Sequence, residues 1–155
     1  MGLTDLFSTD GAFLDLDLTS KSSLLHALSD EASRRLSRPR EEIFEALQDR
    51  ERLGPTALGR GVALPHTQLA EIDNPVAIFA RLRRPIEFGA KDGESVDLVF
   101  LVLWPAKSPE GFLPALARIC RALREDQTLR RLRLAKSPDE ALAVLHQAEH
   151  QAASA

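Results

Sequence analysis

The sequence has little of what a disulfide-linked, metal-binding or membrane-spanning protein needs. Cys120 is the only cysteine among 155 residues, which excludes an internal disulfide and a site built from several cysteines. No apolar run approaches the ~18 residues that a membrane-spanning helix requires. The first residues do not form a basic segment followed by a long apolar one, as a targeting sequence would. These absences predict a soluble, cytoplasmic protein without membrane insertion.

The sequence also lacks an excess of charge of either sign. The chain has 20 Lys and Arg and 23 Asp and Glu, which gives a formal net charge of −3. Residues of the two signs are mixed along the chain. Nucleic-acid-binding domains concentrate positive charge on one surface, so this composition argues against a nucleic-acid partner. A chain of this length with 44% apolar residues predicts one domain, residues 1–155, with a full hydrophobic core.

Three segments have the patterns of β-strands. Residues 12–18 alternate apolar and acidic side chains, which is the period of a half-buried outer strand. Residues 96–104 are nearly all β-branched or large apolar, as expected of a central strand covered on both faces. Residues 76–82 predict a further strand between these two in the sequence.

Helix starts alternate irregularly with these strands. Ser20 and Pro39 mark two helices in the first third of the chain. Ser108, followed by proline and glutamate, marks a third, and Ser137, with a glutamate three residues later for a capping box, marks the last. The tail from about residue 147 is expected to fray, because few apolar side chains anchor it. The order of elements predicts an α/β protein with a mixed sheet.

The stretch Gly59-Arg60-Gly61-Val62-Ala63-Leu64-Pro65-His66 is the most informative part of the sequence. A histidine that follows a short apolar run ended by Pro65 is presented at the surface. Near pH 7 an imidazole of ordinary pKa, ~6.5, is largely neutral and nucleophilic. Gly59 and Gly61 let backbone N–H groups approach an anion closely. This combination indicates a phosphohistidine site, and a turn without chemistry is the alternative.

The longer stretch from residue 51 to residue 66, ERLGPTALGRGVALPH, resembles the active-site segment of the fructose/mannitol-type enzyme IIA domains of the bacterial sugar phosphotransferase system. In that family the segment typically reads ERExxxTGIGxGIAIPH, and its histidine carries the phosphoryl group. The resemblance continues through residues 85–88, 92–103 and 113–118, and it looks closest to the nitrogen-regulatory branch. It implies a mixed sheet covered by helices on both faces.

The resemblance also implies roles for the neighbours of His66. Arg52 would bind phosphoryl oxygens through its guanidinium, and Thr56 would donate through its hydroxyl. The N–H groups around Gly59 and Gly61 would form a small anion nest. The alternatives are a solvated arginine at a helix end and a turn hydroxyl. The resemblance also implies the partners in phosphoryl transfer. A histidine phosphocarrier protein would donate the phosphoryl group, and regulatory target proteins or a transporter domain would accept it.

Phe112 is the most consequential departure from the family pattern, because the family usually has a second histidine at this position. A phenyl ring cannot donate a hydrogen bond to a phosphate, so transfer would be slower or the phosphorylated form shorter-lived. Thr67-Gln68 replace a glycine and a basic residue, and Ala57 replaces a glycine. Two functions therefore stay open: a phosphotransferase-type carrier with regulatory output, and a binding regulator that uses the same surface without transferring phosphate.

Other side chains give weaker predictions. His146 and His150 have a spacing that can bind a metal, but the sequence supplies no third ligand beside them, and we predict neither a metal nor a cofactor. Cys120 is assigned to the core, and His26 to a helix surface or to a partly buried structural role. A hydrolase with His66 as its base ranks last, because no motif places a serine or cysteine nucleophile near it.

Overall fold

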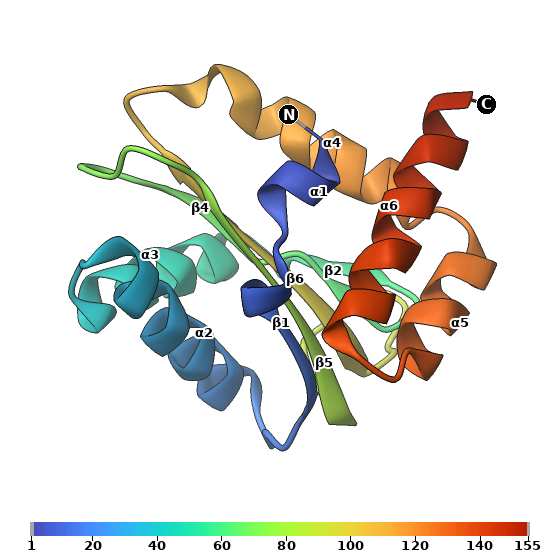
Figure 1. The fold of residues 1–155 in the computed structure, drawn as a ribbon. Helices are drawn as coiled ribbons and strands as arrows, with labels where there is room; N and C mark the ends of the chain where they lie inside the picture. Colours follow the sequence, from blue (N-terminus) through green and yellow to red (C-terminus); the bar gives the residue numbers. More distant parts are fainter. Residues whose placement is uncertain (1, 155) are drawn as a thin grey trace.

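The fold is built on a six-stranded mixed sheet (Figure 1). It comes from a computed structural model that describes residues 2–154. The strand order is β1-β5-β6-β3-β2, and β4 also pairs with β6. The strands are β1 (Ala12–Leu16), β2 (Ala57–Gly59), β3 (Val62–Ala63), β4 (His66–Leu69), β5 (Val76–Ile86) and β6 (Val96–Pro105).

The central strand β6 has neighbours on both sides, as its composition predicted. It runs antiparallel to β5 on one side and parallel to both β3 and β4 on the other. Val62 pairs with Leu98 and His66 pairs with Val102, so β3 and β4 form one interrupted strand along β6. The first strand, β1, lies at an edge beside β5, which confirms the predicted outer strand.

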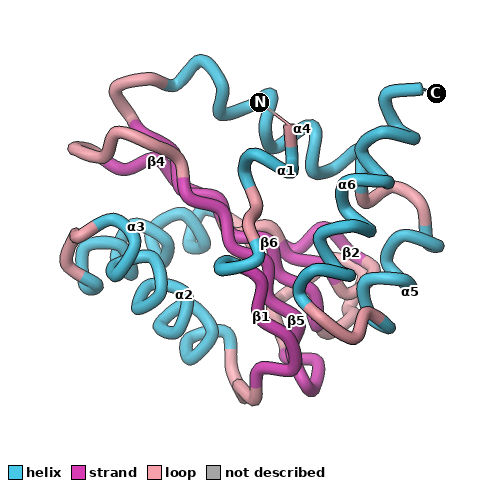
Figure 2. The backbone as a smooth tube through the Cα atoms, in the orientation of Figure 1, coloured by secondary structure: helices cyan, strands magenta, loops and turns pink. Residues whose placement is uncertain are grey.

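Helices cover both faces of the sheet, which confirms the α/β class and the arrangement that the resemblance implied (Figure 2). One face carries α2 (Lys21–Leu36) and α3 (Arg40–Leu53), which pack together. The opposite face carries α1 (Leu3–Leu6), α4 (Phe112–Ala122), α5 (Asp126–Leu134) and α6 (Pro138–Ser154). Short 3-10 turns, η1 (Thr9–Gly11) and η2 (Pro109–Gly111), precede β1 and α4.

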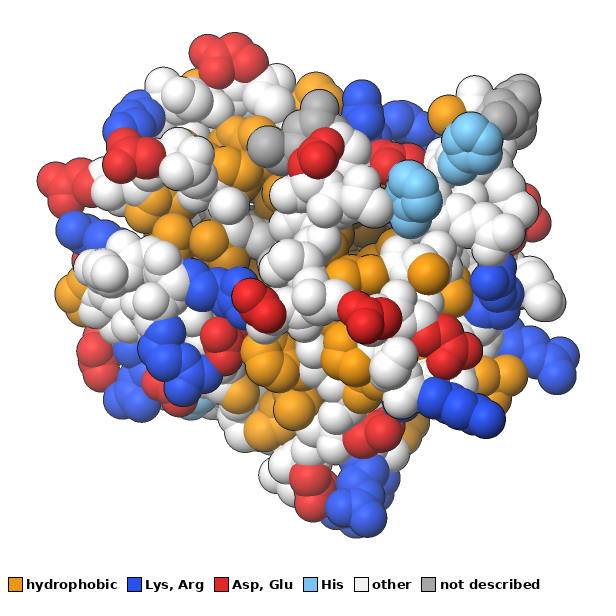
Figure 3. Space-filling model, in the orientation of Figure 1, with side chains coloured by type: hydrophobic (Ala, Val, Ile, Leu, Met, Phe, Trp, Pro, Cys, Tyr) orange, Lys and Arg blue, Asp and Glu red, His pale blue; other side chains and the backbone are white. Residues whose placement is uncertain are grey.

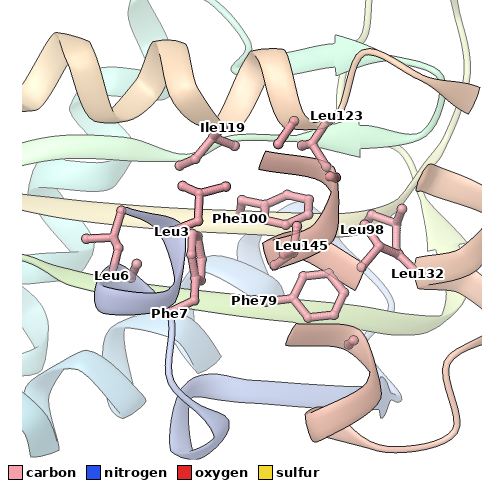
Figure 4. Close-up of a cluster of buried hydrophobic side chains, with 14 of the residues drawn as sticks. Leu3, Leu6, Phe7, Phe79, Leu98, Phe100, Ile119, Leu123, Leu132 and Leu145 are labelled. Atoms are coloured by element: carbon pink, nitrogen blue, oxygen red, sulfur yellow. The ribbon is translucent and has the colours of Figure 1, made fainter. Parts of the chain in front are cut away.

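Each face of the sheet has its own apolar core. On the face of α1 and α4 to α6, aromatic rings form the centre, and Figure 4 shows Phe7, Phe79 and Phe100 converging there. The Phe79 and Phe100 ring centroids are 5.0 Å apart, and Phe7 meets Phe100 edge-on at 6.0 Å. Aliphatic side chains of α2 and α3, with Phe88, fill the other core. Burial on both sides explains why β6 is apolar along nearly its whole length.

Two of the predicted helix starts have the expected serine caps. Ser20 Oγ accepts a hydrogen bond from the backbone N–H of Ser23 at 3.1 Å, and Ser137 Oγ accepts one from Glu140 at 3.1 Å. The capping box at the second start is shifted by one residue, because the Glu140 carboxylate accepts from the N–H of Lys136. Both contacts satisfy N–H groups that a helix leaves unpaired.

The start of α4 differs from the prediction. Ser108 makes no side-chain cap; the chain first forms η2, and α4 begins at Phe112. The Trp104 indole N–H donates to the Ser108 carbonyl at 2.8 Å. A Cβ on Gly111 would come within 2.5 Å of the Trp104 ring. Packing against Trp104, and not a serine cap, therefore sets where this helix begins.

Two further predictions need correction. Cys120 is exposed, because α4 turns Ile119 and Ala122 toward the sheet and its neighbour Cys120 away from it. The tail does not fray at residue 147: α6 continues to Ser154 and buries Ala148. The unpredicted helix α1 accounts for this, because the Leu3 amide donates to Glu149 at 3.0 Å on α6. Residue 155 lies outside the described part of the chain.

The helix α5 was not predicted, because four of its nine residues are charged and few apolar side chains mark a face. Its C-terminal end is satisfied by Arg81, a buried arginine of β5. The Arg81 guanidinium donates to the carbonyls of Leu132, Arg133 and Ala135, and to the carboxylate of Asp15. A cation at a helix C-terminus is favourable both for the unpaired carbonyls and for the helix dipole.

Replacing Arg81 by methionine should therefore destabilise the fold by about 3 kcal/mol, because buried carbonyls lose their donor. Arg84→Met is a matched control, since Arg84 lies in β5 as well and pairs with Asp17, just after β1, but is 70% exposed. An exposed ion pair contributes less than about 1 kcal/mol, so this variant should unfold close to the wild type in urea. Equal losses for the two variants would contradict the capping role.

Candidate functional site

His66 is the first residue of β4 and lies at the break between β3 and β4. It is half-buried, and its Nδ1 lies 2.7 Å from the backbone oxygen of Leu64. A carbonyl oxygen can only accept a hydrogen bond, so in the neutral ring Nδ1 carries the proton. The lone pair then resides on Nε2. The local backbone thus selects one tautomer and leaves one nucleophilic nitrogen.

The surroundings of His66 keep the imidazole neutral. Burial is the main cause that lowers its pKa below 6.5, since it penalises the charged ring. The hydrogen bond to Leu64 opposes this shift, the positive charge of Arg50 lowers the pKa further, and the negative charge of Glu51 raises it. The net direction is downward. At neutral pH the ring is therefore mostly in its nucleophilic form.

The arginine whose charge reaches His66 is Arg50, not the predicted Arg52. Arg50 is half-buried in the last turn of α3, where its guanidinium donates to the Gly54 carbonyl at 3.0 Å. Arg52 is 68% exposed and pairs with Asp49 at 3.0 Å. Two residues apart on a helix place side chains on opposite faces. The sequence contained a signal for Arg50: it follows the buried Leu47 by three residues, so the two side chains lie on the same face of α3.

Thr56 is buried, and its hydrogen bonds go to Glu51 instead of to the site. The Thr56 N–H donates to Glu51 Oε2 at 3.1 Å, and the Thr56 hydroxyl donates to Glu51 Oε1. Lys21 approaches the same carboxylate at 2.7 Å. The hydroxyl predicted to meet a phosphate is therefore already used, and Glu51, which is 9% exposed, is a residue that the sequence analysis missed.

Gly59 and Gly61 lie away from His66, contrary to the predicted anion nest. Both have left-handed φ values, +88° and +80°, and they form the turn between β2 and β3. The N–H of Arg60 between them donates to Asp92 at 2.9 Å. Along β6, Leu98 pairs with Val62 and Val102 pairs with His66. These two positions of β6 are four residues apart, or about 13 Å at 3.3 Å per residue. Glycine suits both positions of the turn, because it adopts left-handed φ values at no steric cost.

Phe112, in contrast, lies beside His66 as the resemblance implied. The two ring centroids are 5.9 Å apart, and Phe112 also contacts Trp104 at 6.0 Å. The next residue, Leu113, is 72% exposed. The position that usually holds a second histidine in the family therefore forms an apolar wall of the site.

Among residues 2–154, no group of three or more His, Cys, Asp and Glu side chains is placed to hold a metal ion. None of the described helices is long and apolar enough to cross a bilayer. On the face of the molecule shown in Figure 3, acidic and basic side chains are interspersed.

Comparison with known proteins identifies the family of this chain. Residues 5–148 match the family model described as "Phosphoenolpyruvate-dependent sugar phosphotransferase system, EIIA 2". The chain belongs to this family. It is 39% identical over 145 residues to a nitrogen regulatory protein of Bradyrhizobium diazoefficiens, covering 94% of this chain and 95% of that protein. The resemblance seen in the sequence is therefore confirmed.

Solved EIIA structures have the same fold. The nitrogen regulatory protein IIA-Ntr of Neisseria meningitidis superposes with a TM-score of 0.89 at 30% identity, over 92% of this chain and 98% of that one. Enzyme IIAMTL of Escherichia coli, solved in complex with phosphorylated enzyme IIBMTL, superposes with a TM-score of 0.75 at 19% identity, over 91% and 97% of the two chains. The second likeness is one of fold alone. This EIIA 2 protein is a homologue of nitrogen regulatory proteins.

The electrostatics of the site give a pH prediction. His66 should titrate with a midpoint below 6.5, because burial and the Arg50 charge both disfavour the imidazolium. Arg50→Gln should move the midpoint upward. Arg52→Gln should leave it unchanged, since Arg52 pairs with Asp49 at the surface. The measurement is an NMR titration of the His66 ring, and an equal response to the two substitutions would contradict the assignment of Arg50.

Proposed function

We propose that this EIIA 2 protein is a regulatory phosphocarrier, in which Nε2 of His66 accepts a phosphoryl group from a histidine phosphocarrier protein. The observation that carries the proposal is the hydrogen bond from Nδ1 to the Leu64 carbonyl at 2.7 Å, which leaves Nε2 as the nucleophile. The relationship to nitrogen regulatory proteins supports a role in nitrogen, potassium or carbon regulation. The proposed place of action is the cytoplasm.

The transfer step needs no metal and no proton from the protein. The lone pair of His66 Nε2 attacks phosphorus, the new N–P bond forms, and the N–P bond of the donor histidine breaks with its electron pair left on the donor ring. His66 keeps its Nδ1 proton, and its ring gains the positive charge that the donor ring loses. The Leu64 carbonyl oxygen, 2.7 Å from Nδ1, stabilises that charge. Catalysis therefore consists of positioning and electrostatic stabilisation.

Arg50 is the residue that we propose for binding the phosphoryl oxygens. One of its N–H groups donates to the Gly54 carbonyl, and a guanidinium has five, so donors remain for an anion. This is the role that the sequence analysis gave to Arg52. Thr56, Gly59 and Gly61 are then parts of the scaffold that holds the loop, and not groups that touch the phosphate.

The phosphoryl group adds about −1.5 to −2 charges near neutral pH, which changes the partners that this surface can bind. Regulatory target proteins or a transporter domain are the proposed acceptors. The fold shared with IIAMTL of Escherichia coli, whose complex with phosphorylated IIBMTL is known, supports a domain of the IIB kind as one acceptor.

Labelling with a phosphorylated carrier protein tests this function. The wild type should gain one acid-labile, base-stable phosphoryl group, and His66→Ala should gain none. Arg50→Gln should be labelled at least about tenfold more slowly, equivalent to ~1.4 kcal/mol of transition-state stabilisation. Arg52→Gln, the matched control on the same helix, should react like the wild type. Label that persists in His66→Ala would refute the assignment.

A binding regulator that does not transfer phosphate is the second candidate, and the Phe112 ring beside His66 favours it. Phe112→His should restore a donor at this position, so the variant should be phosphorylated faster or keep its phosphate longer than the wild type. Phe112→Leu keeps the wall apolar and should do neither. If the well-folded histidine variant matches the wild type in labelling rate and phosphate lifetime, the position does not influence the phosphoryl group.

A further inference from the structure

We propose that Glu51 and Thr56 are positioning residues that fix the tautomer and the orientation of His66 through the backbone of Leu64. This inference rests on the proposed function of His66, because it explains how one ring nitrogen is kept free for phosphorus. The contacts form a continuous series from a buried carboxylate to the imidazole. Lys21 anchors the series at its far end.

The first link is the buried Glu51 carboxylate, which contacts three donor groups. It accepts from the N–H and the hydroxyl of Thr56, and it pairs with Lys21 Nζ at 2.7 Å. Lys21 in turn donates to the Phe88 carbonyl at 3.3 Å and lies 4.3 Å from the centre of the Phe88 ring. The carboxylate thus ties the end of α3 to the start of α2 and to the loop before β2. A buried charge is tolerated only when it is satisfied in this way.

The second link runs from Thr56 to the imidazole through Leu64. The Thr56 carbonyl accepts from the N–H of Leu64 at 2.9 Å, and the Leu64 carbonyl accepts from His66 Nδ1 at 2.7 Å. Leu64 is only 3% exposed, so water does not readily replace either bond. A hydrogen bond in such a place fixes direction as well as distance.

The need for this series follows from Pro65. A proline has no N–H, so β6 cannot hold the chain there through a donor from Pro65. The Pro65 carbonyl accepts from Val102 at 3.0 Å, which fixes the chain on the His66 side of the break. Thr56 fixes it on the Leu64 side. Between these two points the Leu64 carbonyl points toward His66, with its oxygen 2.7 Å from Nδ1.

The pair Thr56→Val and Thr56→Ser tests the proposal. Valine removes the hydroxyl at almost constant volume, and serine restores it. In the unphosphorylated protein the ring nitrogen shifts of His66 report the tautomer by NMR. We expect the wild type and Thr56→Ser to show one tautomer with the proton on Nδ1, and Thr56→Val to show a mixture. Labelling of Thr56→Val should slow by at least about fivefold, and serine should recover most of the rate.

Thr128→Val is the matched control, because Thr128 is also buried, at 7% exposed against 5% for Thr56, and lies in α5. It should leave both the tautomer and the labelling rate unchanged. If Thr56→Val does not fold, Lys21→Met serves instead, since it removes the anchor of Glu51 from a half-exposed position and should produce the same mixed tautomer. A single Nδ1–H tautomer in the folded variant, Thr56→Val or Lys21→Met, would overturn the proposal. Because the tautomer is read without phosphate, a failure of labelling in every variant would instead count against the proposed function.

Discussion

The register of β3 and β4 along β6 is the constraint on which the rest of the structure depends. Two short parallel strands share one long partner, and the Leu64-Pro65 break between them places His66 opposite Val102. The break gives the imidazole a carbonyl partner that an unbroken strand would have used in its ladder. A regular strand would also have presented the histidine without fixing its tautomer. The irregularity therefore fixes both the position of His66 and the hydrogen-bond partner of its ring.

Much of the remaining polar structure secures the other end of this interrupted strand. Arg60, in the turn between the two glycines, donates to the carbonyls of Leu123 and Arg124 at the end of α4. Arg133, in α5, holds Asp97 at the start of β6 and the Arg60 carbonyl. Charged side chains at this end therefore satisfy helix ends and turns. The glycine-rich loop that precedes the histidine is thus tied to Asp92 and to the ends of two helices.

Local sequence patterns predicted the elements that their own residues determine. They failed for elements and side chains whose position depends on contacts with distant parts of the chain. The apolar run of residues 96–104 and the serine cap at residue 20 identified β6 and the start of α2, since each is determined by its own residues. The charged helix α5 was missed, because its carbonyls are satisfied by Arg81 from a distant strand. Arg52 was chosen for its place in a motif, whereas the orientation of α3 selects Arg50. No apolar periodicity or motif singles out Glu51, because its role depends on Thr56 in the loop before β2 and on Lys21 at the start of α2.

The packing of Trp104 has a consequence for how the protein can be observed. It is the only tryptophan in the chain, its indole N–H is held by the Ser108 carbonyl, and its ring contacts Phe112, which in turn contacts His66. Indole emission is sensitive to the electric field and to the rigidity of its surroundings. A phosphoryl group on His66 would alter both the field and the rigidity around Trp104. The fluorescence of Trp104 would then report phosphorylation of His66 without an added dye.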